Sequence, residues 1–519
     1  MPTSRQRLRA VPLAGLLAVS LAACGSTVQQ TGQGQLAGSG GSGGLTSGDG
    51  LGGGAAAGGT SLPADAGSGA VNGVTGPTGT TSGSTGASAS GAGSTVAGAP
   101  AAGTAGSAAS APKGAAVTTP ISVGFVTVDY TKAVAAAGGP SSGQGTRNAD
   151  RVFKDYVRAF NVAGGLGGRQ IKPLYYVVDG SSSNYDSGFA AACAYFTEDN
   201  KVEMVASVGL VNHLFSDCVA RKNVPEYNGM SWTHPQKVLA KFPGYFGPVG
   251  VSHERASASS VDLAVGQGWI KKGDKVGIVV DGCPEHEAAA KQIVQPRLNK
   301  AGISSVMVTP YECPKGFGSL GAITAGMQNA VLRFRQEGVK TVFYVTYVEN
   351  VAHLAFVQQA DSQNYVPAYV LNSTTFLAAL VDTMPERQRP GMRGIGWQPV
   401  TDLWVQPTAP SPARTACLDL LKKADIQQPK NMDEVFAMFS ICDLMTLMDA
   451  QLRATKGSAR ISDLSATRAS LKGSYTSAIG WGPVDLTDGE GPELVAPFSY
   501  RPDCSCVKFE GKPVPLARV

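Results

Sequence analysis

One long stretch of this chain is poor in large apolar side chains, and folding is therefore confined to the rest. Residues 25–118 contain no aromatic residue and only three charged ones, Asp49, Asp65 and Lys113, yet they hold 28 of the 66 glycines. Such a segment cannot bury enough apolar surface to offset the entropy lost on ordering. We expect a disordered Gly/Ser/Ala/Thr-rich linker over 25–118. All 37 aromatic residues lie in 119–519, which is long enough for two domains.

Composition and charge exclude several classes of protein. The glycines follow no strict three-residue period, which excludes a collagen-like chain. No uninterrupted apolar stretch of about 18 residues follows the first 30, which argues against a polytopic membrane protein. The net charge is +5, and Arg5, Arg7 and Arg9 supply three of these charges. Because the remainder has no basic stripe, we expect no nucleic-acid partner.

The N-terminus has the layout of an export signal. The positive segment 5–9 precedes 13 apolar residues, 11–23, which are too few to span a bilayer. Leu-Ala-Ala-Cys-Gly over 21–25 resembles the lipobox of bacterial lipoproteins, in which the cysteine is lipidated after cleavage. The resemblance implies a signal peptide over 1–24 and an extracytoplasmic protein, lipid-anchored to the bacterial cell membrane through Cys24. The alternative is an ordinary secretory signal with a chance cysteine.

Eight further cysteines fall into couples along the chain. In an exported protein an even number of cysteines indicates disulfides. The couples are separated by 25, 30, 25 and 2 residues, and we predict pairing by neighbour as Cys193–Cys218, Cys283–Cys313, Cys417–Cys442 and Cys504–Cys506. The last pairing stays open because so small a ring is strained. Zinc is the alternative, but the histidines (His213, His234, His253, His286 and His353) show no ligand spacing, so we predict no metal or other cofactor.

Strand and helix patterns alternate through the folded part. Expected strands cover 121–128, 171–178, 203–208, 224–227, 275–280, 304–308, 341–346 and 368–371. Expected helices cover 147–163, 186–199, 212–222, 285–301, 321–337, 350–363 and 432–455. This alternation predicts an α/β protein with parallel sheets flanked by helices, in two lobes rather than one. Ligands of such sheets bind beyond the carboxyl ends of the strands.

Three stretches carry a family resemblance. The first runs from the strand at 121–126 to Asn-Val-Ala-Gly-Gly-Leu-Gly-Gly-Arg over 161–169. The second joins the strand ending at Asp179 to 200–209, and the third joins 275–281 to 342–347. Together they resemble the type I periplasmic-binding fold of substrate-binding proteins of ABC importers, of the branched-chain amino-acid (Leu/Ile/Val) type.

The resemblance implies two lobes that close on a small ligand and are joined by three hinge strands. Lobe one would comprise 119–247 plus 377–485, and lobe two 248–376 plus 486–519. The partners would be a small molecule and an ABC permease in the membrane, with the protein itself a monomer.

In lobe one, the resemblance places the ligand's carboxylate at the loop after the third strand. Backbone N–H groups and hydroxyls there would bind it, although Leu210 stands where a hydroxyl residue is usual. The implied contacts of this lobe are Asp129, Tyr130, Ser207, Val208, Gly209, Leu210, Tyr227, Asn228, Ser231 and Trp232.

In lobe two, Tyr347 aligns with an aromatic residue that covers the ligand. The family's acid for a ligand ammonium falls near Ser373, where no carboxylate stands. Because a buried ammonium needs a partner, Glu349 or Glu285 would have to replace it. The resemblance therefore implies a ligand that is an amino acid or a related polar or amphipathic compound, and a less polar or neutral ligand is equally compatible with these residues.

Other functions remain as alternatives. The stretch 139–143 fits the letters of a G-x-S-x-G nucleophile elbow, but it lacks the preceding strand that a serine hydrolase needs. The stretch 316–321 fits G-x-G-x-x-G, but a Cys-Pro pair separates it from the strand, so we interpret it as a loop and helix start. We predict a binding protein without enzymatic activity, with a ligand-sensing receptor as the second hypothesis.

Overall fold

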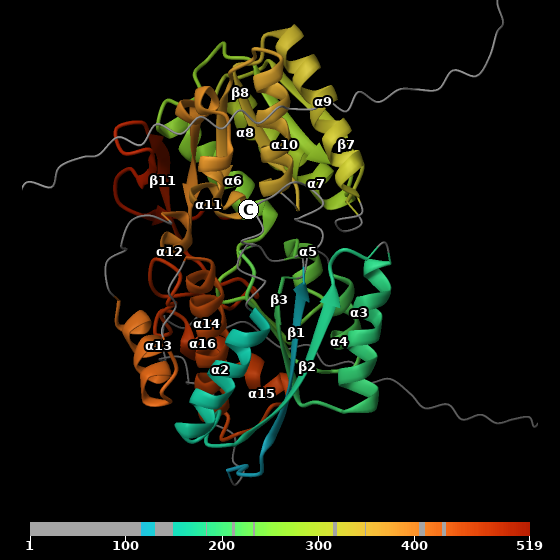
Figure 1. Cartoon of the computed structure of the whole chain (residues 1–519), viewed down its shortest axis with the longest axis vertical. Coiled ribbons are helices and arrows are strands. Elements are labelled where there is room, and N and C mark those ends of the chain that lie inside the picture. The colour runs from blue at the N-terminus through green and yellow to red at the C-terminus, as the bar shows by residue number, and fades with distance from the viewer. Residues whose placement is uncertain are drawn as a thin grey trace, which may run out of the picture. The chain divides into compact units, whose positions relative to one another are not determined.

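The computed structural model describes residues 116–129, 149–182, 184–209, 213–231, 234–314, 319–347, 349–403, 411–427 and 432–519, without the side chains of 432 and 433. Within these residues the strands form two sheets (Figure 1). The first sheet is parallel, in the order β2-β1-β3-β4-β5. Its strands are β1 (Ile121–Asp129), β2 (Ile171–Asp179), β3 (Met204–Val208), β4 (Glu226–Asn228) and β5 (Tyr245–Phe246).

Helices cover both faces of the first sheet because its central strands are apolar on both sides. Phe125 of β1 packs on Phe153 of α2, with ring centroids 4.9 Å apart, and the next residue, Val126, belongs to the core on the opposite face. The helices on the Phe125 side are α2 (Ala149–Val162), α13 (Pro412–Lys423) and α14 (Met432–Ala454). On the other side lie α3 (Tyr185–Ala194), its π-helical extension Tyr195–Asp199, and α4 (Leu214–Arg221).

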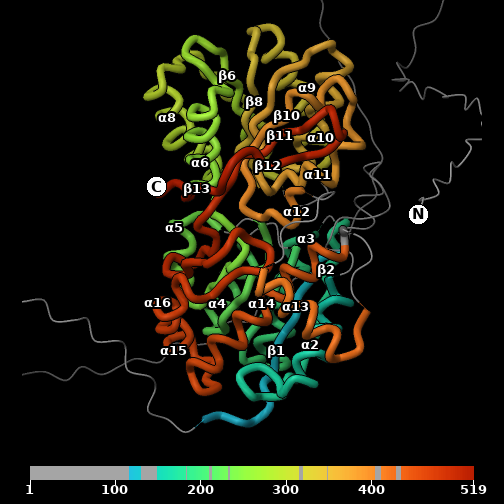
Figure 2. The backbone as a smooth tube through the Cα atoms, turned by 90° about the vertical axis from the view of Figure 1, so that its left-hand side faces the viewer, coloured from blue at the N-terminus to red at the C-terminus, as the bar shows by residue number. Residues whose placement is uncertain are grey.

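The second sheet combines parallel and antiparallel strands, in the order β12-β11-β10-β9-β8-β6-β7, with β13 paired to β11. Its parallel strands are β6 (Val276–Asp281), β7 (Val306–Tyr311), β8 (Thr341–Val345), β9 (Ala368–Asn372) and β10 (Met392–Gly396). The antiparallel strands are β11 (Leu494–Arg501), β12 (Cys506–Phe509) and β13 (Val514–Pro515). Figure 2 shows the red C-terminal strands beside β10.

Two helical layers enclose this sheet. One comprises α6 (His253–Gly266) and a continuous helix made of α7 (Pro284–Ala289), the π segment Ala290–Val294 and α8 (Gln295–Lys300). The other comprises α9 (Leu320–Glu337) and α10 (Glu349–Ser362). Short helices fill the connections, namely α5 (Gln236–Leu239), α11 (Leu377–Leu380), α12 (Pro399–Asp402), α15 (Ile461–Ala466), α16 (Arg468–Leu471) and 3-10 turns at Ser373–Thr375, Val381–Thr383 and Glu386–Gly391.

The chain passes between the two sheets three times. It leaves the first sheet after β5, returns after β10, and leaves again before β11. The three crossings contact one another, since Gly491 N–H donates to Gly250 O at 3.3 Å and Gln398 Nε2 donates to Val249 O at 2.8 Å. A Cβ at Gly491 would lie 2.1 Å from Pro248 O, so this approach requires glycine. The expected three-stranded hinge is therefore present.

The strands and helices expected from the sequence are all present, with shifted ends, but β5, α6, α13, β10–β13 and the short connecting helices were not expected. The position of β10 also bears on the lobe boundaries. Residues 377–485 were expected in lobe one, yet β10 is hydrogen-bonded between β9 and β11 of the second sheet. We therefore propose that the crossing back to lobe one follows β10, near residue 397, rather than residue 377.

All four predicted disulfides are present, including Cys504–Cys506. They join α3 to α4, the start of α7 to the segment after β7, α13 to α14, and the two sides of the β11–β12 turn. The expected signal peptide, Cys24 and almost all of the linker lie outside the described residues, as do the stretches 139–143 and 316–318.

The helix α14 is long and apolar enough to cross a membrane, since an 18-residue window within Glu434–Ala454 has a mean hydropathy of 1.4. However, 78% of that window is buried inside the fold, where it packs on α2 and β4. We interpret α14 as the core helix of the first lobe.

Candidate functional site

In each sheet the chain places successive strands first on one side of a central strand and then on its other side. The position of this change is the topological switch point of the sheet. In the first sheet β2 and β3 lie on opposite sides of β1, and in the second sheet β7 and β8 lie on opposite sides of β6. In open α/β sheets ligands bind outside the carboxyl ends of the strands that flank such a switch point. The candidate site is therefore at the ends of β1 and β3 in one lobe, and of β6 and β8 in the other.

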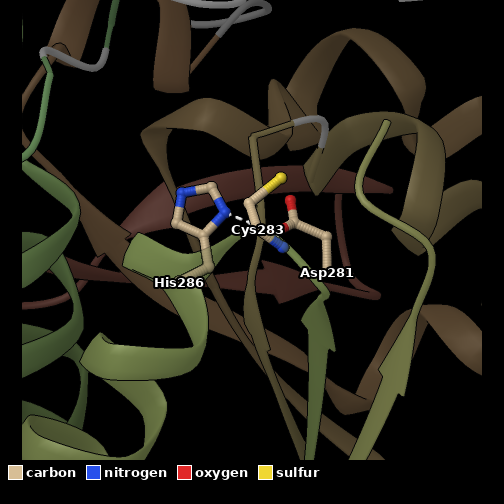
Figure 3. Close-up of side chains that lie close together, drawn as sticks. All are labelled: Asp281, Cys283 and His286. Carbon is tan, nitrogen blue, oxygen red and sulfur yellow. Dashed lines mark hydrogen bonds and ion pairs between the residues drawn. The ribbon is translucent and has the colours of Figure 1, made fainter. Parts of the chain in front are cut away.

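The second switch point is organised around Asp281, the last residue of β6. Its carboxylate accepts hydrogen bonds from His286 Nδ1 at 2.5 Å, from the Tyr347 backbone N–H at 3.0 Å and from the Cys283 backbone N–H at 3.3 Å. Asp281 thus ties the end of β8 and the start of α7 to the end of β6. Figure 3 shows His286 on its helix with the ring directed at Asp281.

Tyr347 and Glu285 meet at this point, as the sequence analysis placed both in the site. The Tyr347 hydroxyl donates to Glu285 Oε1 at 2.6 Å, and Glu285 is half-buried. Burial, together with the nearby Glu285 carboxylate, raises the pKa of Tyr347, so the phenol stays neutral. Its ring packs edge-on against His286, at 4.1 Å between centroids, and against His253, at 5.1 Å.

His253 and His286 are functional candidates that the sequence analysis did not place here. Their ring centroids are 4.2 Å apart, and both side chains are buried. Burial lowers the pKa of His253, and the neighbouring His286 and His234 lower it further. The two residues are 33 positions apart in the sequence on different helices, so no local spacing could have signalled the pair.

Among the described residues, one cluster of possible metal ligands is present, and it lies at this switch point. It consists of Asp281, Cys283 and His286. Cys283 is bonded to Cys313, so it offers no thiolate. Asp281 and His286 bind each other, which leaves too few ligands for a structural zinc site.

Most of the predicted residues of lobe one that the structure describes lie near the carboxyl ends of β3 and β4, and three of them are hydrogen-bonded to neighbours within the lobe. Ser207 Oγ donates to Glu226 Oε1 at 2.7 Å, and Asn228 Oδ1 accepts from Met230 N at 2.9 Å. The Tyr227 hydroxyl donates to Gln451 Oε1 at 2.6 Å inside the lobe.

The other predicted residues of lobe one lie in different surroundings. Val208 is a core residue. Gly209 has φ +92, a conformation that favours glycine. Asp129 is exposed at the end of β1, while Tyr130, Leu210 and Trp232 lie outside the described residues.

Glu349 and Ser373, the other two predicted residues of lobe two, belong to a second group of polar side chains at the end of β9. Glu349 accepts from Asn372 Nδ2 at 2.6 Å and from Thr374 Oγ1 at 3.2 Å, and also from Thr375 Oγ1. Burial raises the pKa of Glu349 to about 7. Ser373 instead donates to Asp402 Oδ2 at 2.9 Å. Because these hydrogen bonds saturate Glu349, Glu285 is the more available of the two acids.

The carboxyl ends of the two sheets meet at the hinge. Ser231, three residues after β4, donates through Oγ to Gln398 Oε1 at 2.9 Å. Its carbonyl accepts from the indole N–H of Trp397, which directly follows β10, at 3.0 Å. Ser231 thus serves as a hinge contact that joins the two lobes at the ends where ligands are expected.

No protein-family model and no curated protein matches the sequence. Solved structures do match. A solute-binding protein of an ABC transporter from R. palustris, in complex with 4-hydroxybenzoate, has 17% identity and a TM-score of 0.56, covering 77% of this chain and 97% of its own.

Two other structures have similar scores. A branched-chain amino acid ABC transporter protein from Thermus thermophilus with bound valine has 14% identity and a TM-score of 0.56, covering 77% of this chain and 98% of its own. A fatty acid ABC transporter substrate-binding protein from Thermomonospora curvata has 15% identity and a TM-score of 0.53, covering 78% and 95%. This chain therefore has the two-lobed type I periplasmic-binding-protein fold found in the solute-binding proteins of ABC transporters.

Proposed function

We propose that this chain is a solute-binding protein, which captures a small molecule between its lobes and delivers it to an ABC permease. The observation that supports this proposal is that each sheet has one switch point. The carboxyl ends of the strands of the two lobes meet at the hinge, where Ser231 and Trp397 are hydrogen-bonded. Closure of two lobes around a ligand is a recurrent motion of such hinged proteins. The proposal involves no covalent chemistry.

The similar structures support a binding role, but their ligands differ in chemistry. One is in complex with 4-hydroxybenzoate, one holds valine, and one is a fatty acid ABC transporter substrate-binding protein. We propose that the ligand of this chain is an amino acid or a related polar or amphipathic compound. Tyr347 and Glu285 would contact it in lobe two, and the segment around Gly209 would contact it in lobe one.

Thermal unfolding of the protein with a panel of such compounds tests this proposal. The panel comprises branched-chain amino acids, hydroxybenzoates, fatty acids and amides. A ligand at 100 times its Kd adds about 2.7 kcal/mol to stability, so at least one compound should raise the Tm measurably. Failure of every compound to do so would contradict a binding function.

We further propose that Cys24 carries the lipid that anchors the protein outside the cytoplasm. Two acyl chains give stable membrane attachment where one gives only marginal binding. The Cys24→Ser variant should therefore move from the membrane fraction to the soluble fraction or the medium. Unchanged membrane fractionation of Cys24→Ser would contradict the anchor.

A further inference from the structure

One ring nitrogen of His286, Nε2, forms no hydrogen bond within the part of the chain that the structure describes. Its Nδ1 is bonded to Asp281, and Asp281 is itself fixed by the backbone N–H groups of Tyr347 and Cys283. A carboxylate accepts hydrogen bonds, so the ring proton lies on Nδ1. In the neutral ring, Nε2 then presents a lone pair, and the orientation of that lone pair is fixed.

This nitrogen is buried and has no hydrogen-bond partner among the described residues. The same holds for two neighbouring atoms, His253 Nε2 and Glu254 Oε2. An unsatisfied buried acceptor costs on the order of 1–3 kcal/mol. Unpartnered atoms of this kind, gathered beside a switch point, indicate a place where a ligand group supplies the missing donor.

The charges around His286 favour a donor over an anion. Asp281, Glu285 and Glu254 are all acidic, and burial keeps His253 neutral by lowering its pKa. Arg255, the cation adjacent to Glu254, points elsewhere and pairs with Glu490 at 3.3 Å and Glu493 at 3.1 Å. A ligand carboxylate would meet repulsion here, whereas an N–H or O–H group would find acceptors.

We propose that His286, oriented by Asp281, accepts a hydrogen bond from the ligand, and that the ligand therefore carries a hydroxyl or ammonium group at the end that enters lobe two. This inference rests on the proposed function and specifies its ligand. Tyr347, whose ring packs on His286, would lie against the same end of the ligand.

Matched pairs of compounds test the donor requirement by calorimetric titration of the full chain. The pair 4-hydroxybenzoate and benzoate tests a hydroxyl, and the pair valine and 3-methylbutanoate tests an ammonium. In at least one pair the member with the donor should bind about tenfold tighter or more, the value of one hydrogen bond. If the two members of each pair that binds have equal affinity, or if the member without the donor binds tighter, the inference is wrong and the binding function still stands. Absence of binding by the whole panel overturns both.

Two variants separate the roles of the ring nitrogens. His286→Asn keeps an N–H that can reach Asp281 but removes Nε2, so the preference for the donor should fall to within about twofold. His286→Gln can place an oxygen near the position of Nε2 and should retain part of the preference. His353→Asn is the control, because His353 is also buried with an unpartnered Nε2 among the described residues, but it packs on Tyr344 and Tyr369 in the core. The inference fails if His286→Asn keeps the full preference.

Discussion

Arg255→Met should lower the free energy of unfolding by about 3–5 kcal/mol, the usual cost of breaking a buried ion pair. Arg255 and Glu490 are both fully buried, and they join α6, which directly follows the first hinge crossing, to the third crossing. Glu490 also accepts from Ser252 N at 2.8 Å. Without the guanidinium, the carboxylate would remain buried with no cation, and urea unfolding at neutral pH measures the loss.

The double variant Arg255→Met/Glu490→Gln is the matched control. It removes both charges, so it should recover much of the stability that the single variant loses. A loss below about 1 kcal/mol for Arg255→Met would show that the ion pair does not hold the hinge. A double variant no more stable than the single one would assign the loss to packing instead.

Asp402→Asn should make the protein more stable above neutral pH. Burial raises the pKa of Asp402 to about 8, although hydrogen bonds from Ser373 and Gln398 oppose this. The folded protein therefore holds a proton that the unfolded chain releases near pH 4. Below about pH 4 Asp402 is protonated in both the folded and the unfolded states and does not lower stability. As the pH rises from about 4 to about 8, the free energy of unfolding falls by at most roughly 1.4 kcal/mol per pH unit.

The asparagine variant has no such titration and keeps an oxygen for Ser373 and Gln398. Its stability should equal that of the wild type near pH 4 and exceed it by several kcal/mol near pH 8, as measured by urea unfolding at several pH values. Asp419→Asn, on the exposed side of α13, should follow the wild-type profile. Parallel pH profiles for Asp402→Asn and the wild type would contradict an ionisable, buried Asp402.

The sequence predicted the parallel strands other than β5 and β10, because their apolar runs need no tertiary context. It did not predict β10 or β11, whose residues break the usual strand pattern. Gly394 of β10 is packed so tightly that a Cβ would lie 2.4 Å from Leu371 O and 2.6 Å from the Phe498 ring. Pro497 interrupts β11, although that strand is paired on both sides.

Helix α6 was overlooked for a related reason. Its sequence is rich in serine and alanine, so apolar periodicity is weak, yet most of the helix is buried. Small side chains allow it to approach the sheet closely, and only the three-dimensional contacts reveal that fit.

For the site, the resemblance located Tyr347 and Glu285, which do meet. It could not locate His253 and Asp281, because only the topology of the sheet and the hinge bring them beside His286. It also could not show that hydrogen bonds from neighbours would saturate Glu349, or that Ser373 would bind Asp402. These pairings depend on where strand ends converge, which no single segment specifies.

The most direct test of ligand capture at the switch points is titration calorimetry of the compound that raises the Tm most, on wild type and on Tyr347→Ala. The matched control is Tyr365→Ala, since Tyr365 is another buried tyrosine of lobe two whose hydroxyl donates to Val339 O, near the start of β8. We expect one ligand per chain, at least tenfold weaker binding by Tyr347→Ala, and unchanged affinity in the control. Equal affinity in Tyr347→Ala and the wild type would contradict the proposed site.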